Sequence, residues 1–192
     1  MNDKKIALNI LGLTYSQSQS GAYALVLNEI NGKRRLPILI GGYEAQAISV
    51  GLDKIELSRP FFHDFVEKLL KELNATLEEI LIYNLLEGVF YAKVSIKHQN
   101  NYIVLDAKVS DLIALAVRLN CPIYTYEPIL SSAGLIINTD DEADFFDELL
   151  ETETKNEFSK LSNEELDALL KESLSNEDYE RAAVIRDEIS RR

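Results

Sequence analysis

The first part of the chain alternates apolar and polar residues in short runs, a pattern typical of β-strands. Three such runs lie within residues 4–40, and Asn31-Gly32 separates the second from the third. Both residues of this pair tolerate positive φ, so we predict a β-hairpin there. Gly41-Gly42 ends the alternation. Residues 43–55 and 60–73 then show the spacing of helices.

A three-strand meander is expected next, over residues 79–108, with turns at Glu87-Gly88 and between His98 and Asn101. Its middle strand should bury one face, formed by Phe90, Ala92, Val94 and Ile96. A third helix is predicted over residues 111–120, with Ser110 as its N-cap, followed by a short strand within residues 121–126.

Strands and helices are mixed without a regular βαβ rhythm, which indicates an α+β domain over residues 1–138. We expect a mixed, largely antiparallel sheet with about three packed helices. Residues 139–160 form an acidic linker that could contain one short amphipathic helix. Residues 161–192 carry two capping-box patterns and predict a helical hairpin, about 163–173 and 176–190. A unit this small buries little surface, so we expect it to pair with its own copy or with a protein partner.

The net charge of −12 is concentrated at the end of the chain. Residues 1–138 carry 13 basic and 14 acidic side chains, whereas residues 139–192 carry 7 and 18. Because nucleic-acid binding depends on neutralising phosphates, the acidic tail argues against binding there. The near-neutral body permits a nucleic-acid substrate, although no basic stripe points to one.

The single cysteine, Cys121, excludes an internal disulfide and a cysteine metal cluster. No apolar run is long enough to span a membrane, and the N-terminus lacks the features of a signal peptide. We therefore expect a cytoplasmic protein with no membrane association. Cys121 precedes Pro122 in an apolar context, which favours a buried, inert thiol over a nucleophile.

His63 and Asp64 stand in the first turn of the second predicted helix. With Phe62 as reference, an apolar stripe of Val66, Leu69 and Leu73 is predicted to face the core. His63 then falls at the edge of this face and Asp64 on the opposite side, so the two cannot form one tight unit. They are either residues that start and seat the helix or catalytic groups that act toward different neighbours.

Three other carboxylates are candidates for chemistry. Glu44 projects toward the apolar face of the first helix, either as a first-turn charge or as a group facing a cleft or a subunit interface. Asp106 lies on the third meander strand, on the same face as Tyr102 and Val104, and Asp111 begins the third helix. Together with a histidine, three carboxylates could bind a divalent ion and activate water for phosphodiester hydrolysis. The third helix is apolar on two sides, which suggests a subunit interface.

Five phrases in one order resemble the bifunctional nuclease domain family and cover about residues 5–135: LPILIGGYEAQAI, RPFFHDF, EGVFYAKV, LDAKVSDLIALAVR and CPIYTYEPIL. The segment NEDYERAAVIRDEI resembles the UVR motif, the helical hairpin through which excision-repair subunits associate. The resemblance implies a bacterial nuclease acting on DNA and RNA. Departures from the family pattern are Gly42-Tyr43, Val109 and Asn84.

The family positions carried over onto this chain are polar. As catalytic residues the resemblance implies Glu44, His63, Asp64, Asp106 and Asp111; as substrate-binding residues it implies Arg59, Gln46 and Ser110. Glu44, Asp106 and Asp111 would hold Mg²⁺ or Mn²⁺, and His63 would act as general base or orient the water.

Two other functions compete with a metal-dependent nuclease. The body could be a non-catalytic homo-oligomeric regulatory scaffold whose C-terminal hairpin binds a protein partner. It could instead be a small-ligand sensor that uses the Gly41-Gly42 turn as an anion site.

Overall fold

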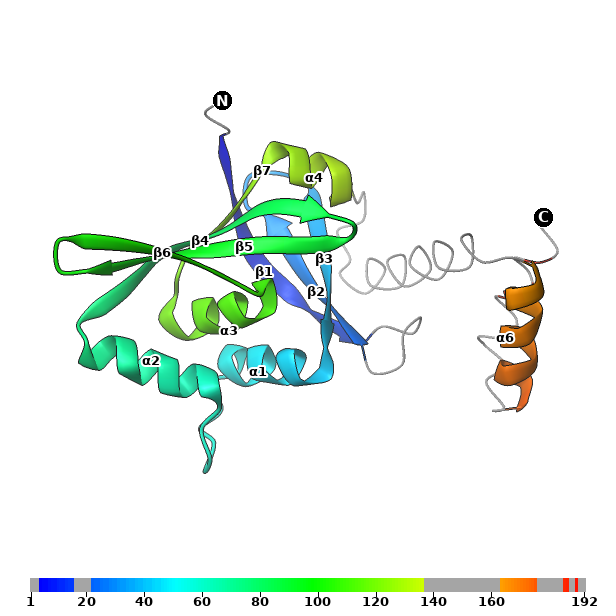
Figure 1. Ribbon diagram of the computed structural model, residues 1–192, viewed down its shortest axis with the longest axis horizontal. Helices are drawn as coiled ribbons and strands as arrows, with labels where there is room; N and C mark the ends of the chain where they lie inside the picture. The colour runs from blue at the N-terminus through cyan, green and yellow to red at the C-terminus, as the bar shows by residue number, and fades with distance from the viewer. Residues whose placement is uncertain (1–3, 16–21, 137–162, 176–184, 187–188, 190–192) are drawn as a thin grey trace. The chain divides into compact units, whose positions relative to one another are not determined.

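The structure is a computed structural model in which two compact units are described separately. The first comprises residues 1–15 and 21–138, and the second comprises residues 16–20 and 139–192. The residues described are 4–15, 22–136, 163–175, 185–186 and 189 (Figure 1).

The first unit is built on one eight-stranded sheet with helices, which confirms the α+β prediction (Figure 1). The strand order is β6-β5-β4-β7-β1-β2-β3-β8. Neighbours pair antiparallel except β4 and β7, which run parallel. The strands are β1 (Lys5–Tyr15), β2 (Ala22–Glu29), β3 (Arg34–Gly41), β4 (Ala75–Leu86), β5 (Val89–His98), β6 (Asn101–Ala107), β7 (Ile123–Tyr126) and β8 (Leu135–Ile136).

The predicted hairpin between β2 and β3 is present, but its turn differs from the expectation. Asn31 and Gly32 are not among the positive-φ residues of the described chain. The connection is longer than a two-residue turn, because the ladder ends at Asn28 opposite Arg35. A Cβ at Gly32 would meet the end of the Glu29 side chain, which would have to move to make room.

Three helices gather on one side of the sheet, as Figure 1 shows: α1 (Gly42–Leu52), α2 (Phe62–Glu72) and α3 (Val109–Leu119). α3 begins directly after Lys108, so the prediction of Ser110 as its N-cap is wrong. The helix starts earlier because the strand ends at Ala107 and the chain turns at once into α3. A short helix, α4 (Glu127–Ala133), and strand β8 were not predicted.

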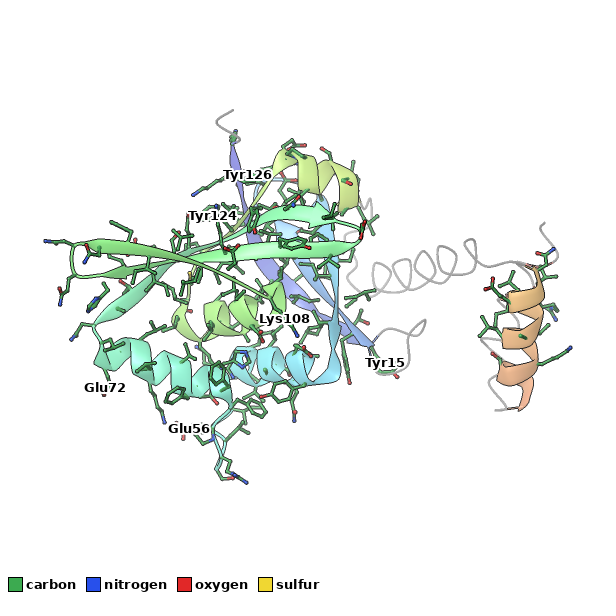
Figure 2. All side chains as sticks on the ribbon, viewed as in Figure 1. Tyr15, Glu56, Glu72, Lys108, Tyr124 and Tyr126 are labelled. Carbon is green, nitrogen blue, oxygen red and sulfur yellow. The ribbon has the colours of Figure 1, made fainter. Side chains whose placement is uncertain are left out.

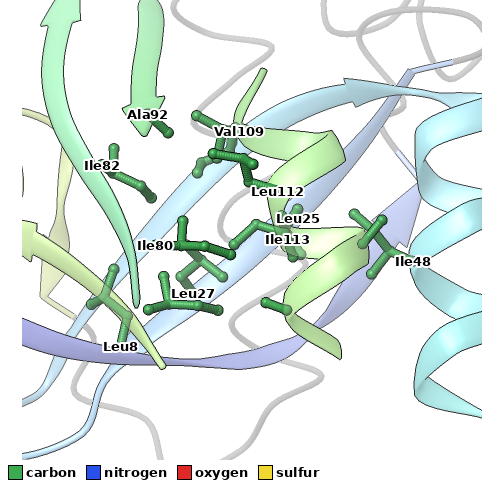
Figure 3. Close-up of a cluster of buried hydrophobic side chains, with 14 of the residues drawn as sticks. Leu8, Leu25, Leu27, Ile48, Ile80, Ile82, Ala92, Val109, Leu112 and Ile113 are labelled. Atoms are coloured by element: carbon green, nitrogen blue, oxygen red, sulfur yellow. The ribbon is translucent and has the colours of Figure 1, made fainter. Parts of the chain in front are cut away.

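The core lies between the sheet and α3, and α1 packs against α3 and against β2 and β3. Figure 3 shows Leu25, Ile80 and Leu112 in this layer and Ile48 reaching in from α1. α3 contacts β4 and β5 as well as α1 and α2. Its two apolar sides are therefore used within the chain, so they no longer indicate a subunit interface.

The apolar stripe of α2 faces outward, contrary to the prediction. Phe62 is 67% exposed and Leu73 is 52% exposed. The buried residues of this helix are His63 and Leu70. The spacing of apolar residues identified the apolar side of the helix correctly, but that side does not face the core of its own chain.

In the second unit, α6 (Asn163–Ser175) agrees with the first helix of the predicted hairpin. Leu166 and Ile185 are fully buried in one apolar cluster. Leu169, Leu170 and Ile189 are partly buried and pack against it. The acidic linker, its amphipathic segment and most of the second hairpin helix lie outside the described residues. In the part of the chain that the structure describes, no helix is long and apolar enough to cross a membrane.

Candidate active site at the helix junction

The first turns of α1, α2 and α3 meet, and four charged or titratable side chains gather there. They are Glu44, His63, Lys108 and Asp111, and we call this group the helix junction. Two pairwise contacts link them: His63 with Asp111, and Lys108 with Glu44. A ring contact between Tyr43 and Phe61, with centroids 5.7 Å apart, joins α1 to α2 beside the junction.

His63 is buried, at 3% exposure, and its Nε2 lies 3.3 Å from Oδ1 of Asp111. Asp111 is the outer member of the pair, with 45% of its side chain exposed. Nδ1 of His63 is also buried and has no hydrogen-bond partner in the structure as described. Buried polar atoms are normally satisfied, so this ring is held in an unusual environment. The arrangement presents a carboxylate to solvent with an imidazole behind it.

Lys108 and Glu44 form a looser pair, with Nζ 3.9 Å from Oε1. Figure 2 shows Lys108 where β6 runs into α3, on the side of α1. Glu44 folds back over the start of α1, because a Cβ on Gly41 would lie 2.6 Å from its Oε2. Its carboxylate therefore stabilises the helix N-terminus and also borders the junction, so both interpretations of Glu44 keep support.

Asp64 points away from His63, as the helical spacing predicted. One carboxylate oxygen accepts a hydrogen bond from the backbone N–H of Phe61 at 2.7 Å, and the other accepts one from Nε of Arg118 at 2.6 Å. Burial alone would raise the pKa of Asp64, but these hydrogen bonds outweigh it and set the pKa below its usual range. Asp64 thus starts α2 and attaches it to α3.

Arg118 ties the three helices together. Besides Asp64 on α2, its Nη1 donates to the backbone carbonyls of Ala47 on α1 and Ala114 on α3, at 2.9 and 2.8 Å. Its side chain is only 5% exposed. Arg118 and Asp64 also line an open cleft of about 580 Å³, whose other lining residues include Gly51, Lys54 and Pro60.

Asp106 does not belong to the helix junction. It accepts a hydrogen bond from the Tyr83 hydroxyl at 2.7 Å, which raises the pKa of Tyr83. The next residue, Ala107, pairs with Ala92, which is buried on the helix side of the sheet. Successive strand residues point to opposite faces, so Asp106 points away from the helices.

The expected metal trio of Glu44, Asp106 and Asp111 is therefore not assembled within one chain. Among the described residues there is no group of three or more histidine, cysteine, aspartate or glutamate side chains placed to hold a metal ion. The direction of Asp106 is the physical reason, and we derive no catalytic step through a metal held by all three.

The predicted substrate-binding residues are separated in the structure. Ser110 is buried, at 8% exposure, in the first turn of α3. Gln46 is exposed on α1 and borders a shallow pocket of about 400 Å³ with Tyr23 and Ser49. Arg59 is exposed in the segment before α2. Only Gln46 and Arg59 are open to a substrate from solvent.

Two residues of this region, Arg118 and Lys108, were not among the predicted site residues. Arg118 had a usable signal, because it is the only charged residue in the apolar run LIALAVRL. A charge in such a run must find a partner when the helix is buried. Lys108 carried no comparable signal.

Comparisons with known proteins agree with the resemblance seen in the sequence. A family model described as bifunctional nuclease domain matches residues 25–138, and one described as UvrB/uvrC motif matches residues 164–191. Two uncharacterized proteins of Mycobacterium tuberculosis, from strains CDC 1551 and H37Rv, are each 38% identical over 138 residues. The aligned part is 71% of this chain and 82% of each relative.

Proposed function

The chain belongs to the bifunctional nuclease domain family, and on that premise we propose that it hydrolyses phosphodiester bonds of DNA and RNA at the helix junction. The observation that carries the proposal is the pair formed by buried His63 and half-exposed Asp111. Exposed Lys108 stands near this pair in sequence and faces Glu44.

Phosphodiester hydrolysis requires a group that removes a proton from water and a group that stabilises negative charge on the phosphate. Asp111 is the solvent-facing acceptor, so it would take the proton, while His63 holds the carboxylate from behind. Lys108, with 75% of its side chain exposed, is the cation that would contact the phosphate. Asp64 would hold α2 in place against α3 and would not contact the substrate.

A divalent ion remains part of the proposal, but with fewer protein ligands than the sequence predicted. Mg²⁺ commonly takes only one or two protein carboxylates together with water and substrate phosphates. We assign Glu44 to that role, without Asp106, because one oxygen of Asp111 faces His63 and the other is the proposed proton acceptor. The ion would supply charge stabilisation for the phosphate.

The test is cleavage of single-stranded and duplex DNA and RNA with Mg²⁺, Mn²⁺ or EDTA. Asp111→Asn and His63→Gln should each lower cleavage by about 10²-fold or more, the usual contribution of a general base. Asp106→Asn and Glu67→Gln are the matched controls and should retain activity. Thermal melts establish that each variant is folded. Wild-type protein without cleavage, or wild-type rates in both junction variants, would refute the proposal.

A second candidate is the non-catalytic homo-oligomeric scaffold, and one observation favours it. The apolar stripe of α2 faces solvent, with Phe62 and Leu73 exposed by 67% and 52%, and Phe65 of the same helix is 56% exposed. Surfaces of this kind are usually covered by a partner. If the wild type is inactive on every substrate above, the scaffold becomes the function that the structure supports.

For the C-terminal unit we propose binding to a protein partner or to a second copy, since the buried cluster among its described residues is small. A cytoplasmic location is part of the same proposal, because the lone cysteine is buried and unpaired.

A further inference from the structure

Strand β6 is an open edge of the sheet, and it carries an unusual surface. It pairs with β5 on one side and stands first in the strand order. All seven of its residues are exposed. Its central residues are apolar and large: Tyr102, Ile103, Val104 and Leu105 are exposed by 64, 44, 53 and 51%.

Open edges of soluble sheets are normally protected by lysine, proline, a bulge or a covering segment. β6 reads NYIVLDA and contains neither lysine nor proline. Its register with β5 runs without interruption from Asn101 to Ala107, so no bulge distorts it. A straight, apolar edge strand of this kind is a template for pairing with another strand.

We propose that β6 pairs antiparallel with β6 of a second copy of this chain, around a two-fold axis at Val104. Full overlap of the seven-residue strand with itself places the axis at its central residue. Ile103 then lies opposite Leu105 of the other copy, and Tyr102 lies opposite Asp106. The single charge of the strand thus meets a phenol rather than its own copy, so no like charges face each other.

A second copy fits this surface better than an unrelated strand because the contact is self-complementary, as a two-fold interface must be. Backbone pairing of β6 would join two eight-stranded sheets into one. The contact would also cover the large apolar side chains of β6, Tyr102, Ile103, Val104 and Leu105, which are now exposed.

The proposal goes beyond the catalytic one and names the surface and symmetry of self-association. Its first test is a single-cysteine cross-link under mild oxidation. In Val104→Cys the two new thiols would face each other across the axis, at the Cα separation of about 4.5–5.5 Å that a disulfide accepts. In the control Tyr102→Cys the two thiols would lie about 13 Å apart along the strand, too far to bond.

Buried Cys121 should not interfere with this assay, since its exposure is 6%. We expect a covalent dimer for Val104→Cys and none for Tyr102→Cys. Equal cross-linking of both variants, or of neither, would overturn the proposed register.

Light scattering after size exclusion gives the second test, on the full chain. Wild type should have twice the chain mass and Val104→Lys the mass of one chain, with an unchanged far-UV spectrum. Phe65→Lys places the same charge on exposed α2, outside β6, and as the matched control it should keep twice the chain mass. A monomeric wild type, or a Val104→Lys dimer beside a Phe65→Lys monomer, would overturn the proposal. Cleavage is measured on the same variants. The molar mass then tests the proposed dimer, and the cleavage rate tests the proposed nuclease activity separately.

Discussion

Replacing Asp64 by asparagine should destabilise the first unit by about 3 kcal/mol at pH 7. The Arg118 side chain is 5% exposed, and Asp64 is its charged partner, while two backbone carbonyls take its other hydrogen bonds. Its Nη2 is already buried without a partner within the described chain. Breaking a buried ion pair from one side costs about 3–5 kcal/mol, because the remaining charge stays buried. The low end applies since the Asp64 side chain is 24% exposed and asparagine keeps one acceptor.

Urea unfolding followed by far-UV circular dichroism measures this change. With a slope of about 1.5–2 kcal/mol per molar urea, the midpoint should fall by roughly 1.5–2 M. Lys71→Gln is the matched control on the same helix. It removes the exposed pair with Glu67 and should cost less than about 0.5 kcal/mol. A loss below 1 kcal/mol for Asp64→Asn, or one as small as the control's, would contradict a buried, stabilising Arg118–Asp64 pair.

The same pair predicts a pH dependence with a definite sign. Burial opposes ionisation of Asp64, but hydrogen bonds from Arg118 and Phe61 prevail and lower its pKa in the folded state. A carboxyl with a lowered folded pKa stabilises the protein above the unfolded value, about 3.9, and loses that effect as pH falls through the folded value. The difference between wild type and Asp64→Asn should be constant from pH 7 to 5 and shrink only below about pH 4. A difference that vanishes by pH 5 would contradict this assignment.

Three further predictions concern other parts of the first unit. Burial raises the pKa of Cys121 to about 12, so a thiol reagent should label it in urea but hardly in the native protein; equal rates would contradict its burial. Hydrogen bonds from Arg34 and then Ser131 lower the pKa of Glu127 to about 2, and Arg34→Met should return it toward 4.3 in a carbon-detected NMR titration. Gly88 has a φ of +79°, so Gly88→Ala should cost about 1 kcal/mol in urea unfolding, whereas Gly88→Asn should cost less.

Most strands could be predicted from the sequence because their alternation and turns are local signals. The turn at Glu87-Gly88 was placed correctly, and both residues have positive φ. The middle strand buries Ala92 and Val94, as its alternation indicated. α4 and β8 were missed because seven and two residues are too short to show a period.

The site was harder to predict, because its contacts join residues far apart in the chain. Asp111 is 48 residues from His63, and Arg118 is 54 residues from Asp64. The spacing along one helix predicts that His63 and Asp64 lie on different sides. It does not predict which residues of other helices they contact. The direction of Asp106 was accessible, since strand alternation puts it on the same face as Tyr102 and Val104.

The α2 stripe shows a limit of periodicity itself. Spacing in sequence reports which side of a helix is apolar, and burial within one chain is only one way to use that side. Phe62 and Leu73 satisfied the pattern while remaining exposed by more than half.

The parallel pairing of β4 with β7 has a consequence for how the chain reaches its native state. β7 stands between β4 and β1, so the meander β1-β2-β3 and the meander β4-β5-β6 do not touch as neighbouring strands. Each meander can form from local pairs, but the strand that joins them, Ile123–Tyr126, follows both of them in the chain. During synthesis at about 5–20 residues per second, both half-sheets must therefore wait with open edges for seconds before they are joined. Non-local pairing forms more slowly than local pairing. We therefore expect the addition of β7, rather than hairpin formation, to limit the rate of refolding.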